Sequence, residues 1–580
     1  MKLLEYNDSD ALGHVKSVDT SSVIVHIANI ELLRKMQVNR LVVLQSAKAG
    51  HNLIGVVTKI TRTSGGHQHE VEFEDSTQLI EETNTVRISL IGTLIDQVGS
   101  KKNVFRRTLE TVPEIDSRCF SMEGDKLTGF MRTISHLTGE EKNKLSLGKY
   151  TLDESAEAFL SGNKFFQRHA VIVGSTGSGK SWTTAKLIEQ VSGLDNANAI
   201  LFDIHGEYKT LQAPGIRHLK IAGPEEVKLS RSLEQGVIHL PAWLLTYEKL
   251  ITMLVDRSDQ NAPNQSMLLA RTILECKTKY LESIGKKDIL NNFTVDSPIP
   301  FDISKVLETL NDVNTEMVDG ARGQKQGEFY GKLGRLIQRL ENKISDRRLG
   351  FMFSKDKNLM EYDWLHKLIS MLMSGSSRQN DRTGGVKIID LSEVPSDILP
   401  LTVSLMSELI FSVQQWTISS KRHPIAIFCD EAHLYIPEQY SGGTSAEASL
   451  NSFERIAKEG RKYGVSLVII SQRPSEVNKT VLSQCNNFIA MRLMNSDDQS
   501  VIKRLLPDSL GGFGDLLPIL DVGEALVVGD ASLLPSRIRI SEPSTRPDSG
   551  TIDFWDRWAL TEYQADLTQS VEFLRKQSKA

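Results

Sequence analysis

The chain has 580 residues, of which 40% are hydrophobic and 24% charged, a composition typical of a folded globular protein. Its 68 basic and 73 acidic residues give a formal net charge of −5, which excludes a chain that binds nucleic acid through overall positive charge. Any such contact requires a local basic surface. The cysteines, Cys119, Cys276, Cys429 and Cys485, lack CxxC or Cys/His spacing, which argues against a zinc site and a disulfide framework.

Neither a targeting segment nor a membrane segment is expected. Charged residues follow Met1 at once, at Lys2 and Glu5, so the hydrophobic region of a signal peptide is missing. The longest apolar runs, such as residues 465–470, are far too short to span a bilayer. The sequence therefore predicts a cytoplasmic protein that does not enter a membrane.

Residues 1–96 predict a small closed β-barrel. Short apolar runs recur there between turn signals such as Ser64-Gly65-Gly66. These runs cover residues 23–27, 41–44, 53–60, 71–73 and 86–94. Several short strands in a segment of this length favour a closed barrel, and no catalytic constellation lies among them. We interpret the segment as an assembly or partner-docking domain.

Residues 97–146 are expected to form a mixed connector, which opens with a basic patch at Lys101, Lys102, Arg106 and Arg107. Over 147–540, apolar runs alternate with helical segments, a pattern typical of an α/β fold with a mostly parallel sheet. A helical insertion is expected at about 244–377. Residues 541–580 are expected to form a loose crossover tail that ends in a helix.

One helix of the insertion is clearly amphipathic. Leu333, Leu336, Ile337, Leu340 and Ile344 fall on one stripe, and Lys332, Arg335, Arg339 and Lys343 fall largely elsewhere. The basic face is compatible with contact to DNA, contact to a neighbouring subunit, or simple exposure to solvent.

The most specific motif is a phosphate-binding loop. An apolar strand at 169–173 leads into G-x-x-x-x-G-K-[ST] and then into a helix, which is the context that this motif requires. The expected ATP-binding residues are Gly174, Ser175, Thr176, Gly177, Ser178, Gly179, Lys180, Ser181 and Trp182. Backbone N–H groups of such a loop surround phosphates at the N-terminus of a helix. Lys180 is expected to reach the β- and γ-phosphates, and the Ser181 hydroxyl is expected to bind Mg²⁺.

Hydrolysis also needs an acid that holds the metal and a base that activates water. A second buried strand, at 425–429, ends in Asp430 and Glu431. Asp430 suits the Walker B role of holding the Mg²⁺ shell, and Glu431 suits polarisation of the attacking water. His433 completes the letters Asp-Glu-Ala-His, with either a structural or a coupling role.

Three further polar residues are candidates for the catalytic site. Gln472 follows the apolar strand 465–470 and is placed to sense the γ-phosphate or to cap that strand. Arg461 and, second, Arg455 lie on a basic helix end, where either could act on the nucleotide of a neighbouring subunit. Basic residues also favour helix C-termini for dipole reasons, so a local role stays open for both.

The segment Asp203-Ile-His205-Gly206-Glu207-Tyr208 follows another apolar run. Its polar side chains are expected at the edge of the sheet where ligands gather in open α/β folds. A supporting role around Mg²⁺ or the attacking water is compatible with this position.

Together these motifs resemble those of the HerA family, in the HerA/FtsK branch of P-loop ATPases. The resemblance rests on the P-loop, on the Asp203 and Asp430 motifs, and on Glu459-Gly460-Arg461-Lys462-Tyr463-Gly464 and Ser471-Gln472-Arg473-Pro474. It also includes 485–492 and 523–529. It implies a RecA-like ATPase core preceded by a barrel of the HAS type.

The resemblance further implies an ATPase that works as a homohexameric ring, with ATP and Mg²⁺ between subunits and double-stranded DNA in the channel. A C-terminal tail would brace a neighbouring subunit. An effector, a nuclease or a sirtuin-like NADase, would dock on the barrel. The usage of Met, Cys, Asn and Gln differs from that of hyperthermophile proteins. This favours a bacterial anti-phage setting over end resection in repair. The serine- and glycine-rich stretch 438–452 departs from the family pattern. It leaves open which arginine, Arg461 or Arg455, aligns with the one that acts on a neighbouring subunit's nucleotide.

Other readings remain open. The letters Asp-Glu-Ala-His suggest a superfamily 2 helicase, although only one ATPase lobe is visible. Secretion and conjugation ATPases share the same core, and often carry membrane segments. The ring could also be a scaffold that assembles and regulates its effector without moving along DNA.

Overall fold

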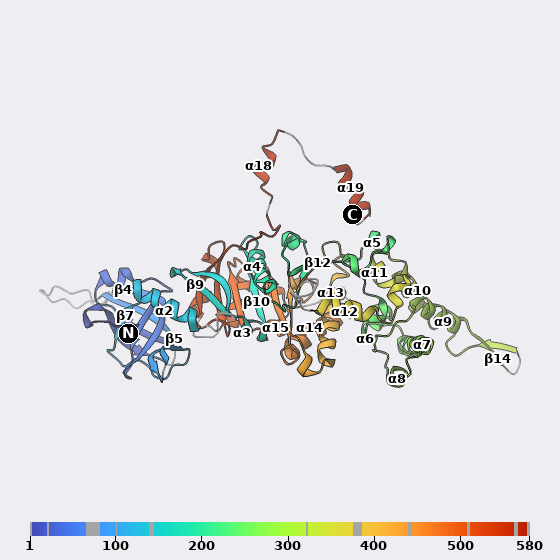
Figure 1. The fold of residues 1–580 in the computed structure, drawn as a ribbon, viewed down its shortest axis with the longest axis horizontal. Coiled ribbons are helices and arrows are strands. Elements are labelled where there is room, and N and C mark those ends of the chain that lie inside the picture. Colours follow the sequence, from blue (N-terminus) through green and yellow to red (C-terminus); the bar gives the residue numbers. More distant parts are fainter. Residues whose placement is uncertain are drawn as a thin grey trace, which may run out of the picture. The chain divides into compact units, whose positions relative to one another are not determined.

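The structure is a computed structural model (Figure 1). It describes residues 3–19, 22–64, 82–99, 101–137, 144–320, 323–374, 385–438, 444–506, 511–550, 552–561 and 567–576. The chain forms two compact units. The first contains 1–190, 471–475 and 485–543, and the second contains 191–470, 476–484 and 544–580.

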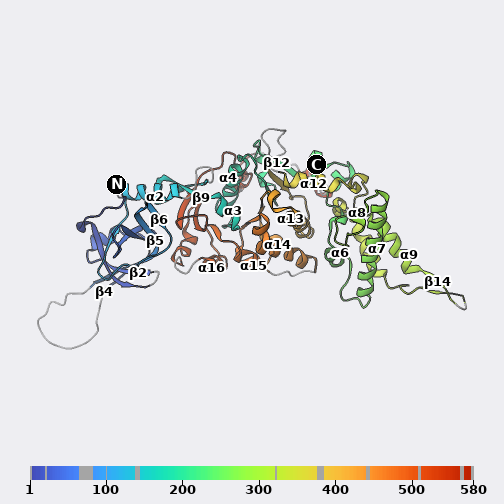
Figure 2. The same ribbon diagram turned by 60° about the horizontal axis from the view of Figure 1, so that its bottom comes forward.

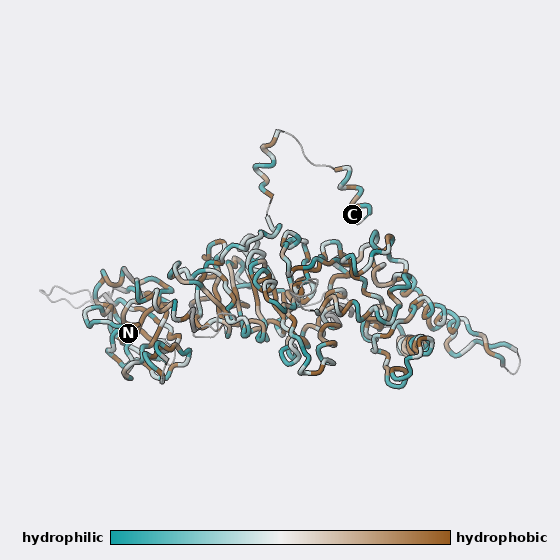
Figure 3. Tube along the Cα trace, viewed as in Figure 1, coloured by the Kyte–Doolittle hydropathy of each residue, from teal (hydrophilic) through white to brown (hydrophobic). Residues whose placement is uncertain are grey.

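The first unit begins with the predicted barrel. Its strands are β1 (Ala11–Val18), β2 (Ser22–His26), β3 (Leu41–Gln45), β4 (His51–Ser64), β5 (Glu82–Val98), β6 (Lys101–Arg106) and β7 (Arg118–Ser121). Within the described residues the order is β2-β1-β7-β3-β4-β5, and a β2–β5 pairing closes the circle. The apolar residues of these strands form one buried core, and Figure 3 colours hydrophobic residues brown along the backbone trace. The prediction of a barrel is therefore confirmed.

The barrel differs in detail from the sequence-based expectation. Strand β7 pairs with β1 and β3, and β6 pairs with β5, so the sheet uses residues that were assigned to the connector. Strand β1 and helix α1 (Ile30–Lys35) were also not predicted, because their apolar residues are few and irregularly spaced. The turn at Gly65-Gly66 and the run 71–73 lie outside the described residues.

The rest of the first unit carries the strands around the P-loop. These are β8 (Lys144–Tyr150), β9 (Asp153–Ser161), β10 (Ala170–Val173), β19 (Asn487–Met491), β20 (Glu524–Gly529) and β21 (Ser536–Ile540), in the order β10-β19-β20-β21-β8-β9. Only the β10–β19 pair among them is parallel. The helices are α2 (Gly124–Leu137), α3 (Gly162–Gln167), α4 (Lys180–Ser192), α16 (Ser496–Leu505) and α17 (Gly511–Gly514). Arg107 of the predicted basic patch donates to the carbonyl of Gly529 at 2.9 Å.

The second unit contains a parallel sheet. Its strands are β11 (Ala199–Asp203), β12 (Ile216–Ile221), β13 (Val237–Ile238), β16 (Val386–Asp390), β17 (Ile425–Cys429) and β18 (Val465–Ser471), in the order β13-β12-β16-β11-β17-β18. Strands β11, β17 and β18 are buried along their whole length, as expected for strands with both faces covered. The sheet is accompanied by α5 (Pro224–Lys228), α13 (Leu399–Trp416), α14 (Thr444–Tyr463) and α15 (Lys479–Ser483). The α/β class is confirmed.

The predicted insertion is mostly helical. It contains α6 (Tyr247–Leu254), α7 (Ala262–Ser283), α8 (Lys287–Leu290), α9 (Ile303–Thr315), α10 (Gly334–Ser345), α11 (Gly350–Phe353) and α12 (Trp364–Met373), and a hairpin of β14 (Met317–Gly320) and β15 (Gly323–Gln326) (Figure 2). Leu336, Ile337 and Leu340 on α10 are buried as predicted. On its basic face, Arg339 pairs with Asp256 at 3.0 Å and Arg335 lies 3.7 Å from Asp259. The positive charge of this face is partly neutralised by acidic side chains of the same chain. This favours exposure of the face to solvent over contact with DNA.

The tail carries two helices, α18 (Phe554–Trp558) and α19 (Leu567–Lys576). Trp555 is 80% exposed and Trp558 72%. Among the described residues, none of the helices combines the length and the hydropathy needed to cross a membrane.

Candidate nucleotide-binding and hydrolysis site

The P-loop has the backbone geometry that its glycines are expected to provide. Gly177 and Gly179 have φ values of 73° and 109°, which residues with a side chain rarely adopt. At Gly174, a Cβ atom would lie 2.3 Å from Ser178 Oγ and 2.8 Å from Met491 Cβ. Helix α4 starts at Lys180, so the loop ends at a helix N-terminus, where anions bind favourably.

The side chains of the loop fit a bound triphosphate. Lys180 is 7% exposed, and its Nζ donates to the carbonyl of Ser175 at 3.5 Å, a weak bond that a phosphate can replace. The Ser178 hydroxyl is fully buried and has no hydrogen-bond partner in the part of the chain that the structure describes. An unsatisfied hydroxyl and a lysine beside a glycine-rich turn are the groups expected of an ATP site.

The predicted sensor lies beside the P-loop. The hydroxyl of Thr176, the third residue of the motif, donates to Gln472 Oε1 at 2.5 Å. Both side chains belong to the first unit. The structure thus brings Gln472 into hydrogen-bond contact with a P-loop side chain.

The two predicted acids lie at the end of β17, in the second unit. Asp430 is 4% exposed and Glu431 5%, and His433 Nδ1 lies 3.3 Å from Glu431 Oε2. Glu431 has a φ of 44°, a left-handed conformation that costs about 1–3 kcal/mol and is concentrated at functional sites. Both acids are therefore buried in a defined turn and do not simply end the strand.

Tyr435 fixes this turn, a feature that sequence reasoning missed. Its hydroxyl donates to the backbone carbonyl of Asp430 at 2.8 Å. Burial raises the pKa of Tyr435 well above its usual range, so the phenol stays protonated and remains a donor. The only signal in the sequence is a tyrosine shortly after a Walker B strand, which is too common to be informative.

The two candidate arginines of α14 differ in their surroundings. Arg455 lies 5.4 Å from the centroid of the Phe411 ring and donates to Gln415 at 3.3 Å. Arg461 is exposed, and its side chain makes no ion pair or hydrogen bond within the described residues. The structure therefore gives Arg455 a local role and leaves Arg461 available for another molecule.

The Asp203 motif forms a second carboxylate position, at the end of β11. Asp203 is 1% exposed and accepts hydrogen bonds from the backbone N–H groups of Glu207 and Tyr208, each at 3.0 Å. Asp390 is its partner in the β11–β16 register and was not predicted. The apolar run before Asp390 could have indicated it. Burial raises the pKa of Asp203 to about 6, with Asp390 contributing and the backbone hydrogen bonds opposing.

Asp203 makes the stability of the fold depend on pH. Because the pKa of Asp203 is raised from 3.8 to about 6 on folding, its contribution to stability is fully present below about 3.8 and is lost as the pH rises through about 6. We expect this group to lower the free energy of unfolding by about 1.5 kcal/mol between pH 5 and pH 8. Urea titrations should show that Asp203→Asn removes this part of the pH dependence, and that the exposed Asp312→Asn does not. An unchanged pH dependence in Asp203→Asn contradicts the assignment.

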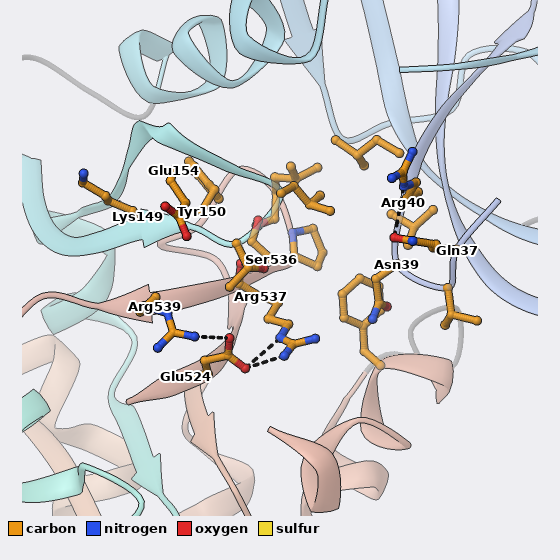
Figure 4. Close-up of a pocket in the computed structure, with 18 of the residues that line it drawn as sticks. Gln37, Asn39, Arg40, Lys149, Tyr150, Glu154, Glu524, Ser536, Arg537 and Arg539 are labelled. Carbon is orange, nitrogen blue, oxygen red and sulfur yellow. Dashed lines mark hydrogen bonds and ion pairs between the residues drawn. The ribbon is translucent and has the colours of Figure 1, made fainter. Parts of the chain in front are cut away.

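A cavity of about 510 Å³ in the first unit lies away from these residues. It is lined by the barrel loop 37–41 and by residues of β8, β20 and β21 (Figure 4). Glu524, 4% exposed, accepts hydrogen bonds from Arg537 Nε at 3.0 Å and from Arg539 Nη2 at 3.1 Å. Both arginines are thus paired with a buried carboxylate in the wall of the cavity.

Ser181 and Asp430 are the predicted protein ligands of Mg²⁺. Among the described residues, no group of three or more His, Cys, Asp and Glu side chains is placed to hold one. Mg²⁺ is commonly held by one or two protein oxygens together with phosphates and water, which fits Ser181 and Asp430 as the only predicted protein ligands. When bound with ATP, it neutralises charge on the phosphates.

The fold and these residues define a RecA-like P-loop ATPase. Residues 145–410 match the family described as helicase HerA, central domain. The match identifies residues 145–410 as similar to a HerA central domain, which bears out the predicted resemblance for this region.

Individual relatives are distant. The chain is 25% identical over 422 residues to a probable helicase of Methanocaldococcus jannaschii, with 71% of this chain and 70% of that protein covered. It is 26% identical over 382 residues to the DNA double-strand break repair helicase HerA of Saccharolobus solfataricus, covering 65% of this chain and 64% of the relative. Among solved structures, VirB4 of Thermoanaerobacter pseudethanolicus is similar with a TM-score of 0.44 and 16% identity, covering 69% and 97% of the two chains.

Proposed function

We propose that this ATPase is a homohexameric motor that moves along double-stranded DNA. The observation that carries the proposal is the combination of a P-loop, a sensor glutamine bonded to it and a HerA-type central domain in one chain. Relatives named as helicases support DNA as the substrate.

Each residue has a defined role in the proposed reaction. The P-loop from Gly174 to Ser181, with Trp182 behind it, holds the triphosphate, and Lys180 binds its β- and γ-phosphates. Ser181 and Asp430 hold Mg²⁺. Glu431 accepts the proton of the attacking water, and Gln472 responds to the γ-phosphate through Thr176.

Two features support assembly into a ring. Arg461 is exposed on α14 and is available to complete the site of a neighbouring subunit. The tail is anchored in the second unit by Asp548, whose N–H donates to the carbonyl of Glu207 at 2.7 Å and whose side chain pairs with Lys209 at 2.9 Å. Beyond this anchor, Phe554, Trp555 and Trp558 are at least 60% exposed. Such side chains favour a partner surface, and a neighbouring subunit is the proposed one.

The biological setting is a second part of the proposal. We infer that an effector, a nuclease or a sirtuin-like NADase, docks on the barrel, in bacterial anti-phage defence. End resection in recombination repair is the alternative, and the names of the HerA relatives favour it. A scaffold that regulates its effector without moving along DNA is the other alternative.

The motor and scaffold functions differ in their response to DNA. We expect linear double-stranded DNA to raise steady-state ATP hydrolysis severalfold, because a motor couples turnover to movement on its track. The purified chain is assayed with and without DNA, and Glu431→Ala measures contaminating activity. If the rate of ATP hydrolysis does not change with DNA while the chain still activates an effector, the motor hypothesis is contradicted and the scaffold hypothesis is favoured.

A further inference from the structure

One side of helix α7, in the helical insertion, remains accessible in the part of the chain that the structure describes. The helix packs against α9, and Leu269 and Ile273 on its inner side are fully buried (Figure 2). On its outer side, Met267 is 51% exposed and Leu274 is only half-buried. Spacings of three and four residues are those of a contact between two helices. We call the outer stripe the residues Met267, Ala270, Leu274 and Thr278.

Four charged side chains run along one flank of the outer stripe, and their signs alternate. In chain order they are Arg271, Glu275, Lys279 and Glu282, and all four residues are exposed. At about 100° per residue, their directions around the helix axis fall within about 80° of one another. Arg271 Nε lies 3.0 Å from Glu275 Oε1, with the two side chains 72% and 46% exposed, so both remain accessible to another molecule.

This charged flank is complementary to itself when two copies of α7 run antiparallel. In an antiparallel pair, each flank faces the same flank of the other helix, whereas in a parallel pair it faces the opposite one. The pairs Arg271–Glu282 and Glu275–Lys279 are both centred at positions 276–277. A single twofold axis at this point therefore places every charge of the flank opposite a charge of the other sign.

We propose that the outer stripe and its charged flank bind the same surface of a second copy of this chain, through a twofold contact between antiparallel α7 helices. The second copy is selected because it supplies the missing half of each charge pair. Apolar side chains lie at the centre and charges at the rim, as in other protein interfaces.

The symmetry of this contact fixes which copies it joins. Neighbours within a cyclic ring of six are related head to tail, so a twofold contact cannot lie between them. The contact therefore joins two rings, a step that rests on the proposed hexamer. A contact between two single helices is small and weak alone. Several such contacts between two rings act together, which raises the overall affinity.

The test reverses charges on the flank of the full chain and measures particle mass in solution by mass photometry. Arg271→Glu and Glu282→Arg should each halve the particle mass of the wild type, because like charges then face each other across the axis. The swap Arg271→Glu/Glu282→Arg in one chain should restore the full mass, since each pair again has opposite signs. Mixing the two single variants should restore it for the same reason.

The matched control is Lys305→Glu/Lys325→Glu, which reverses charges on two exposed residues elsewhere in the insertion and should keep the wild-type mass. Two single variants of opposite charge keep the test decisive if one of them does not fold. The inference is overturned if the wild type has the mass of the single variants, or if the swap does not restore the mass. Failure of the proposed hexamer is distinct, because the particles would be smaller while the twofold change in mass persists.

Discussion

Glu431→Ala should lower the steady-state rate of ATP hydrolysis by at least about a hundredfold and leave ATP binding close to that of the wild type. A positioned general base contributes about 10²- to 10⁴-fold to such a step. Glu431 is 5% exposed, in a left-handed backbone conformation, and 3.3 Å from His433. A surface acid at a strand end would have no reason to occupy such a strained and buried position.

The measurement pairs turnover with binding. Hydrolysis is followed as phosphate release, and binding is followed with a fluorescent ATP analogue. Lys180→Ala is the matched control, since it is expected to weaken binding itself by removing a cation from the phosphates. Glu431→Gln keeps the shape of the side chain and removes the base, so it should be as inactive as Glu431→Ala. Normal turnover in Glu431→Gln would falsify the assignment of the base.

The motifs that were predictable are those in which local chemistry and local structure coincide. The P-loop could be identified because a strand, a glycine-rich turn and a helix must follow each other at fixed spacing. The strand 425–429 was equally clear, because a fully buried parallel strand is a continuous apolar run. The conformation of Glu431 was not predictable, since a positive φ in a residue with a side chain is imposed by the surroundings.

Tertiary pairing decided the features that the sequence could not show. Strand β7 has only four residues, and it forms because β1 and β3 offer it partners on both sides. Asp390 becomes relevant only through its register with Asp203. Arg455 and Arg461 differ in their surroundings because Arg455 contacts Phe411 and Gln415. These two residues lie on α13, far away in the sequence.

Arg461→Ala should lower ATP turnover about a thousandfold with little change in ATP affinity, as removal of an arginine that acts on the γ-phosphate commonly does. Arg455→Ala should retain most of the turnover. Its guanidinium packs on Phe411 and lies 4.0 Å from Glu459, so its loss weakens the contact between α13 and α14. A lower melting temperature with near-normal turnover is therefore the expected result for Arg455→Ala. Equal loss of turnover in the two variants contradicts this division.

Mixing two inactive subunits tests whether Arg461 acts on a neighbour. Lys180→Ala subunits retain Arg461, and Arg461→Ala subunits retain the P-loop, so an interface between them in one order contains a complete site. Turnover should therefore return in mixed rings, with a maximum at intermediate ratios, and should not return when Lys180→Ala is mixed with Lys180→Ala/Arg461→Ala. If Arg461 acted within its own subunit, no ratio would restore activity, and the exposed position of this side chain would need another explanation.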